Sequence, residues 1–148
     1  MKTVDTNAYI SALRDLTEQN KEVSLLISGN SMVPFLVHGR DYIVFEKPGR
    51  ELRLGDMVFY QRDAGQFVMH RIFDKKPEGY YLVGDAQMHI EGPVGREQIF
   101  ALVTKAKRKG KWIGPGNFWW EFFEHVWIRV IPFRRMITKA YMILRRIG

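Results

Sequence analysis

The chain has 148 residues, 46% of them hydrophobic and 14% aromatic, which suits one domain with an ordered core and excludes a disordered chain. The formal net charge of +7 is uneven, because residues 105–148 hold 11 of the 23 basic residues but only 2 of the 16 acidic ones. The absence of cysteine excludes a disulfide framework, a thiolate nucleophile and a thiolate metal site. Nucleophilic chemistry is therefore left to oxygen.

Residues 1–22 predict an N-terminal helix. Apolar residues recur at three- and four-residue steps, at Ile10, Leu13 and Leu16, which is the spacing of a helix with one packing face. Charged residues interrupt this segment, and it has no apolar run of the length that a secretory signal needs. We therefore expect a packing helix and no export signal here.

Residues 23–113 predict a β domain. Short runs of β-branched and aromatic residues alternate with clusters of Gly, Pro, Asp and Asn, at a spacing of roughly ten residues. The runs are VSLLIS, YIVFEK, DMVFYQR, QFVMHRIF, GYYLVGD and QIFALVTKAKR. We expect a mainly β fold with helices only at the two ends.

Residues 114–148 predict a basic, aromatic and amphipathic helical tail. The segment 117–131 is rich in Trp and Phe, Pro132 interrupts it, and 133–147 alternates an apolar face with an arginine-rich one. Arginines also interrupt the best candidate for a membrane span, so no transmembrane segment is expected.

Two interpretations of this tail remain open. Trp119, Trp120 and Trp127 beside a basic helix are typical of an interfacial anchor on an anionic membrane, which predicts a peripheral membrane protein over residues 117–148. The other interpretation is a tail that packs on the β domain or on a second copy of the chain, in a cytoplasmic protein. Nucleic acid is disfavoured as a partner, because no recognition motif accompanies the charge.

Four short pieces follow one another through the β region: SGNSMVPFL at 28–36, LGDMVFY at 54–60, VMHRIF at 68–73 and LVGDAQ at 82–87. In this order and spacing they resemble the motifs of the signal peptidase I family of serine peptidases, over about half of the chain. The resemblance implies a coiled antiparallel β domain like that of signal peptidases and self-cleaving repressors. It also implies cleavage of a precursor protein or peptide without a cofactor.

On this resemblance Ser31 corresponds to the nucleophile and His70 to its general base, with Asp85 as the acidic residue that could orient His70. A histidine at this position is similar to archaeal and endoplasmic-reticulum members of the family rather than to the lysine-type bacterial ones. The residue types suit the chemistry, because a serine hydroxyl needs a neighbouring base and a histidine has an unperturbed pKa near ~6.5.

The neighbours of Ser31 have expected roles too. Gly29 permits a sharp turn, and the Ser31 N–H, with the side chain of Ser28 or Asn30, could stabilise an oxyanion. Asp56 is expected to hold a turn or to pair with Arg71.

The residues that follow the nucleophile in the motif also have expected roles. Met32 is expected as an apolar plug near the substrate pocket, and Pro34 as the residue that fixes the turn. Phe35 stands where the family usually has threonine and is expected to narrow or reshape that pocket. The segment GRD at 39–41 carries one residue more than the family's usual GD.

The remaining histidines are His38, His89 and His125. Their spacing fits no zinc motif, so no metal site is expected, and His89 is a weak rival to His70 as base.

Two functions remain in competition. The first is a serine endopeptidase that removes a leader or signal segment from a precursor through an acyl-enzyme on Ser31. The second is an inactive peptidase-like module that binds an extended peptide or a partner at a membrane surface. A self-cleaving repressor is disfavoured, because the residues before the β region are too few for a DNA-binding domain.

Overall fold

The computed structural model describes residues 6–130, 139–140 and 143–145, with residues 6–9 described by their backbone only. In chain order its strands and helices are α1 (Thr6–Glu18), β1 (Val23–Leu26), β2 (Tyr42–Glu46), β3 (Met57–Gln61), β4 (Phe67–Lys76), β5 (Gly79–Val83), β6 (Glu91–Val94), β7 (Ile99–Arg108), β8 (Lys111–Ile113) and α2 (Phe118–His125). Two 3₁₀ turns complete the order, at Arg96–Gln98 and Trp127–Arg129. The protein is mainly β, as the sequence predicts.

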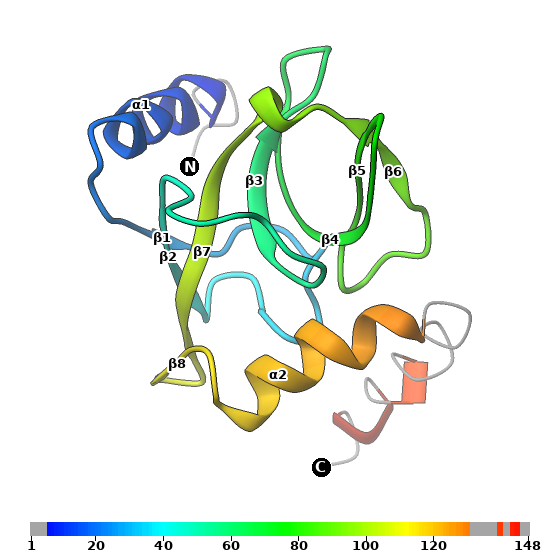
Figure 1. Cartoon of the computed structure of the whole chain (residues 1–148). Coiled ribbons are helices and arrows are strands. Elements are labelled where there is room, and N and C mark those ends of the chain that lie inside the picture. The colour runs from blue at the N-terminus through cyan, green and yellow to red at the C-terminus, as the bar shows by residue number, and fades with distance from the viewer. Residues whose placement is uncertain (1–5, 131–138, 141–142, 146–148) are drawn as a thin grey trace.

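The strands form one antiparallel sheet in the order β1-β2-β7-β3-β4-β5-β6, and β8 pairs with β7 outside this path. Figure 1 shows that the sheet is strongly curved, with β3, β4, β5 and β6 curling around one end of the molecule. Of these strands, β6 and β8 were not expected from the sequence. The expected range of 23–113 for the β region coincides with the first and last residues in strands, Val23 and Ile113.

Two clusters of buried side chains hold this sheet together, one on each side of β3. Met57 and Phe59 point into a cluster that includes β1, β2, α2 and Leu13 of α1. Val58 and Tyr60, which alternate with them, point into a second cluster formed with β4, β5 and β6. Because successive residues of a strand face opposite sides, β3 is buried on both faces and separates the two clusters.

Helix α1 packs as its spacing predicts. Leu13 is buried, and Ile10 and Leu16 lie partly buried against the first cluster. Figure 1 shows the helix beside the end of the sheet that carries β1 and β7.

Helix α2 begins at a side-chain cap, since Asn117 Oδ1 accepts hydrogen bonds from the backbone N–H groups of Trp119 and Trp120. The helix packs on the β domain through Trp120 and Phe123, and Trp127 follows in the same core. Trp120 and Trp127 are therefore core residues and not membrane anchors, because their rings are 94% or more buried. Trp119 remains exposed.

The expected basic helix over 133–147 lies largely outside the described residues. Among the residues that the structure describes, no helix is both long enough and apolar enough to cross a membrane.

Candidate functional site

The loop between β1 and β2 carries Ser31. Backbone hydrogen bonds close the loop at both ends: Ile27 donates to Asp41 at 2.8 Å and Gly39 donates back to Ile27 at 2.9 Å. Near the serine, Gly29 has a φ of 91° and its N–H donates to His38 Nδ1 at 2.9 Å. A side chain at this φ would be strained, so glycine suits the turn before Ser31.

Asp41 fastens the far end of this loop from a fully buried position. Its carboxylate accepts hydrogen bonds from the backbone of Val37 and Lys109 and from the guanidinium of Arg40. Burial raises the pKa of Asp41, but these hydrogen bonds outweigh burial and leave the pKa below its usual value. The segment GRD, which departs from the family pattern, thus ends in a structural anchor of the loop.

His70 lies in the middle of β4, opposite Val58 of β3. Its side chain faces the second cluster and only 3% of its surface is exposed. Burial lowers the pKa of His70 to about 4, with Glu91 acting to raise it and Arg62 to lower it. At neutral pH the ring is therefore uncharged, which is the state that a general base requires.

Ser31 and His70 line the same cavity, whose volume is about 350 Å³. Gly84 lies between them, because a Cβ built on it would come within 2.6 Å of Ser31 O and 3.1 Å of His70 Cδ2. A backbone hydrogen bond stabilises this contact, since the Ala86 N–H donates to Ser31 O at 2.9 Å. All four sequence pieces therefore contribute to this cavity, the second through Phe59 and the fourth through Gln87.

The remaining walls of the cavity are mainly apolar. They come from α1, β1, β3 and β4 and include Ile10, Leu25, Ile27, Phe59, Phe67, Val68 and Met69. An extended chain laid in this cavity would meet apolar side chains beside Ser31 and His70.

Asp85 has a different partner from the one that the sequence suggested. It is fully buried, and its carboxylate accepts hydrogen bonds from Arg71 Nε at 2.9 and 3.2 Å. The group beside His70 Nδ1 is the hydroxyl of Tyr60, at 3.2 Å. Arg71 in turn donates to Gly55 O, and Asp85 O accepts from Trp127 Nε1, so Asp85 joins three elements of the fold.

The other residues of the serine motif divide into two groups. Ser28, Gly29 and Met32 line the cavity, and Met32 is only 2% exposed. Asn30 is exposed and lies outside the cavity lining. Pro34 is buried and follows a cis peptide bond.

The expectation for Phe35 is wrong. Phe35 is absent from the lining of the cavity and is fully buried against α2, with its ring centroid 4.8 Å from Phe123 and 6.1 Å from Trp120. Phe35, Trp120 and Phe123 all belong to the first cluster of buried side chains. Phe35 is therefore a core residue that packs against α2.

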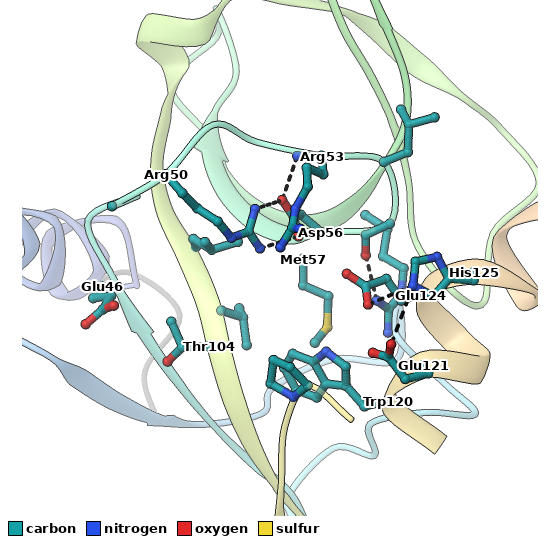
Figure 2. Close-up of a pocket in the computed structure, with 17 residues that line it drawn as sticks. Glu46, Arg50, Arg53, Asp56, Met57, Thr104, Trp120, Glu121, Glu124 and His125 are labelled. Atoms are coloured by element: carbon teal, nitrogen blue, oxygen red, sulfur yellow. Dashed lines mark hydrogen bonds and ion pairs between the residues drawn. The ribbon is translucent and has the colours of Figure 1, made fainter. Parts of the chain in front are cut away.

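A second cavity, of about 580 Å³, lies between the β2–β3 loop and α2. Figure 2 shows Arg50 and Asp56 on one side of it and Glu124 and His125 on the other, with Met57 and Trp120 between them. Asp56 holds a turn, as expected, by accepting from the Arg53 N–H at 2.7 Å. Its ion-pair partner is Arg50, at 2.8 and 2.9 Å, and not Arg71, which was the alternative to the turn.

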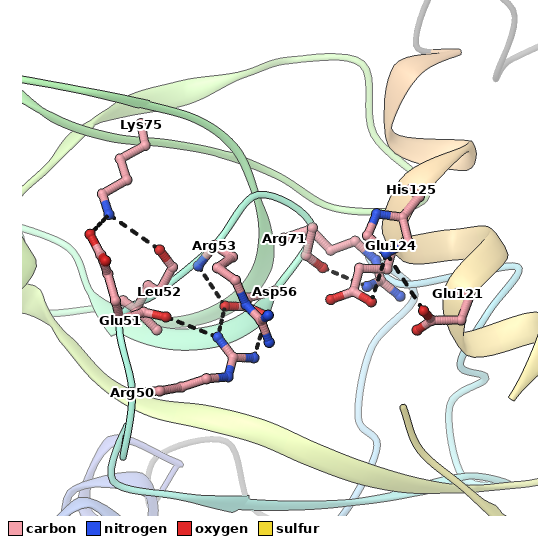
Figure 3. Close-up of polar contacts among 11 residues, drawn as sticks. Arg50, Glu51, Leu52, Arg53, Asp56, Arg71, Lys75, Glu121, Glu124 and His125 are labelled. Atoms are coloured by element: carbon pink, nitrogen blue, oxygen red, sulfur yellow. Dashed lines mark hydrogen bonds and ion pairs between the residues drawn. The ribbon is translucent and has the colours of Figure 1, made fainter. Parts of the chain in front are cut away.

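Figure 3 shows the polar contacts around this cavity, where three ligand-type side chains of α2 gather. The oxygen and nitrogen atoms of Glu121, Glu124 and His125 lie within 4.8 Å of one another. Burial raises the pKa of Glu124, and a hydrogen bond with Glu121 raises it further. His125 Nε2 lies 3.7 Å from Glu121 and 3.3 Å from Glu124, so contacts between neighbouring side chains of one helix account for the cluster.

Comparisons of the chain with family models, with curated proteins and with solved structures gave no match. The functional assignment therefore depends on the geometry of the cavity and on the sequence motifs.

Proposed function

We propose that the protein is a serine endopeptidase of the signal peptidase I type, which removes a leader or signal segment from a precursor. The observation that carries this proposal is the shared cavity of Ser31 and His70, with Gly84 in contact with both. Two residues that are 39 positions apart in the sequence, and of the types needed for nucleophilic catalysis, both line this one cavity.

The proposed reaction has two halves. Ser31 Oγ attacks the carbonyl carbon of the scissile bond and its proton passes to a ring nitrogen of His70. The C–N bond then breaks, and His70 returns the proton to the leaving amine. A water attacks the resulting ester and gives a proton to His70, the ester C–O bond breaks, and Ser31 regains its hydrogen.

The surroundings of the pair support these steps. The His70 ring is neutral above pH 5 and can accept a proton, since burial holds its pKa at about 4. The backbone N–H of Ser31 is the proposed oxyanion donor, with the Ser28 side chain at the cavity wall as a second candidate. The apolar lining suits an extended segment with apolar side chains, such as a leader peptide.

A second candidate is a module that binds an extended peptide in the same cavity without cutting it. The depth at which His70 is buried favours this alternative, because a base with a pKa far below neutral has a weak driving force for proton abstraction.

The proposal is tested with peptides of mixed sequence, whose cleavage products are identified by mass spectrometry. The wild-type protein should cut a subset of these peptides. Ser31→Ala and His70→Ala should each lower kcat/KM by at least about a hundredfold. Peptide binding without any cleavage by the wild-type protein would support the second candidate instead.

Two variants serve as matched controls. Ser24 lies exposed on β1 and His89 lies exposed after β5. Ser24→Ala and His89→Ala should retain wild-type cleavage. A loss in His89→Ala equal to that in His70→Ala would make His89 the base and contradict the assignment.

We further propose that the protein acts at an anionic membrane surface. Trp112, Phe118 and Trp119 are exposed on β8 and α2, in the part of the chain that carries the basic excess. Aromatic rings beside Lys and Arg suit the headgroup region of a bilayer.

A further inference from the structure

The side chain beside the proposed base belongs to Tyr60, the last residue of the second sequence piece, to which the sequence assigned no role. We propose that Tyr60 and Glu91 are positioning residues, which together fix the tautomer of His70 so that Nδ1 carries the hydrogen and Nε2 accepts the proton of Ser31. The inference rests on the proposed function for the role of Nε2. The tautomer itself can be measured independently of activity.

The sheet register brings Tyr60 and His70 together. His70 pairs with Val58 across β3 and β4, and Tyr60 lies two residues further along β3, so both side chains occupy the same face as diagonal neighbours. The Tyr60 hydroxyl lies 3.2 Å from His70 Nδ1. Tyr60 is fully buried and His70 is 3% exposed, so water does not compete for this contact.

Glu91, on β6 at the end of the sheet, provides the charged end of this series of side-chain contacts. Arg62 donates two hydrogen bonds to its carboxylate, from Nε at 2.8 Å and from Nη2 at 2.7 Å. The hydrogen bond from Arg62 is the largest cause that lowers the pKa of Glu91, and burial acts in the opposite direction. Glu91 is therefore ionised at neutral pH and can only accept hydrogen bonds.

Tyr60 connects these two groups. Burial raises its pKa most, and the charge of Glu91 and a side-chain hydrogen bond with Glu91 raise it further, against an opposing effect of Arg62. Tyr60 therefore stays protonated and has one hydrogen to donate. Of the groups around it, Arg62 is a donor only, and Glu91 is the acceptor with a full negative charge.

The direction of the hydrogen bonds follows from this inventory. If Tyr60 donates its hydrogen to Glu91, its oxygen can only accept from His70, so the hydrogen of the neutral ring must sit on Nδ1. Nε2 then has its lone pair available, as a base for Ser31 requires. In a serine triad a carboxylate performs this orienting role directly. Here Asp85 accepts a hydrogen bond from Arg71 instead, and Glu91 acts on His70 through the hydroxyl of Tyr60.

The opposite direction has a distinct consequence. If Tyr60 donated to Nδ1, the ring hydrogen would sit on Nε2, and His70 could not take a proton from Ser31 in that state. The two arrangements give different nitrogen NMR signals for the imidazole ring, so the tautomer decides between them.

The test is a ¹⁵N NMR spectrum of the full chain at pH 7, with His70 assigned through His70→Gln. The wild-type ring should show a protonated Nδ1 and an unprotonated Nε2. Tyr60→Phe keeps the aromatic ring but removes the acceptor, and Glu91→Gln replaces the acceptor-only group, so in both variants the hydrogen should move to Nε2. A wild-type ring protonated on Nε2, or a Nδ1–H signal unchanged in Tyr60→Phe, overturns the inference.

A matched pair on the surface controls for general effects of the substitutions. Tyr81 donates to Glu78 at 2.8 Å at an exposed position on β5. Tyr81→Phe and Glu78→Gln should leave the His70 signals unchanged. A change in either would contradict a local effect at Tyr60.

Kinetics add a second measurement where a peptide substrate has been identified. Tyr60→Phe should lower kcat on the order of tenfold to a hundredfold and leave KM within about twofold, because it alters the base and not the peptide contacts. An unchanged kcat overturns the inference. A wild-type protein without peptidase activity would refute the proposed function, while the NMR spectrum would still decide the tautomer.

Discussion

The neutral His70 ring connects the chemistry of the site with the stability of the fold. In the folded protein burial holds its pKa at about 4, whereas in the unfolded chain it should return to about 6.5. Between these values the unfolded chain binds more protons than the folded one. The free energy of unfolding must therefore fall as the pH decreases from about 6.5 to about 4.

This linkage gives a prediction for the His70→Gln variant. The wild-type protein should lose up to about 3 kcal/mol of stability over this pH range through His70 alone, and the variant should lose that much less. Denaturant unfolding at pH 7.0 and pH 4.5 measures the difference. The exposed His89→Gln variant should keep the wild-type pH dependence, and an equal change in both variants would contradict the origin in His70.

At the scale of single residues, the sequence motifs predicted part of the candidate site correctly. Ser31 and His70 were predicted to share a site, and they line one cavity. Phe35 and Asp85 were assigned to that site as well, but their partners are Trp120, Phe123 and Arg71. The contacts of Phe35 with α2 and of Asp85 with Arg71 depend on how distant segments pack together. The sequence alone therefore could not predict these partners.

At the scale of elements, the turn before β3 determines how α2 can approach the sheet. Gly55 has a φ of 92°, and a Cβ built on it would meet the backbone oxygen and the side chain of Glu124 in α2. Its own carbonyl accepts from Arg71, at 2.8 Å, so the turn cannot shift easily. The glycine of the second sequence motif is therefore needed both for its backbone conformation and for the contact with the helix.

Gly55→Ala should destabilise the fold by more than the strain at this φ alone. The positive φ costs about 1–2 kcal/mol with alanine, and the overlap with α2 adds about 1–3 kcal/mol. Gly65→Ala is the matched control, because Gly65 has a φ of 97° with no atom within 4 Å of the added Cβ. Denaturant unfolding of both variants measures the difference, and equal losses would contradict the contact with α2.

Strand β6 shows why part of the fold could not be predicted. Its sequence EGPV contains Gly92 and Pro93, both of which disfavour strands. It is the last strand of the sheet and pairs with β5 alone in the strand order. An edge strand tolerates a residue without an N–H, but the sequence does not show which segment will be an edge. Glu91 was missed with this strand, so the chain of contacts to His70 had no signal in the sequence.

At the scale of the whole molecule, exposed aromatic rings of β8 and α2 lie beside basic side chains of β7. Lys105 and Lys107 lie over the ring of Trp112 at 5.6 and 5.9 Å, and Arg108 lies over Trp119 at 5.6 Å. Trp112 and Trp119 expose about half of their surface, 52% and 46%. Each ring thus lies beside a cation that could contact an anionic headgroup, while the rest of the tail's tryptophans stabilise the core.

This arrangement predicts binding to vesicles that contain anionic phospholipid, and weak binding to purely zwitterionic ones, because each basic residue near an anionic surface contributes about 1 kcal/mol. Trp112→Ala combined with Trp119→Ala should weaken the binding about tenfold or more, since both rings lose their contact with the bilayer interface. Co-sedimentation with vesicles at low and high salt measures the affinity, which should fall as salt screens the charges. Met88→Ala, which removes an exposed apolar residue on another loop, should bind like the wild-type protein. Equal binding to neutral and anionic vesicles, or an unaffected double variant, would contradict the proposed surface. The main role of the tail's aromatic residues would then be to stabilise the core, where Trp120 and Trp127 are buried.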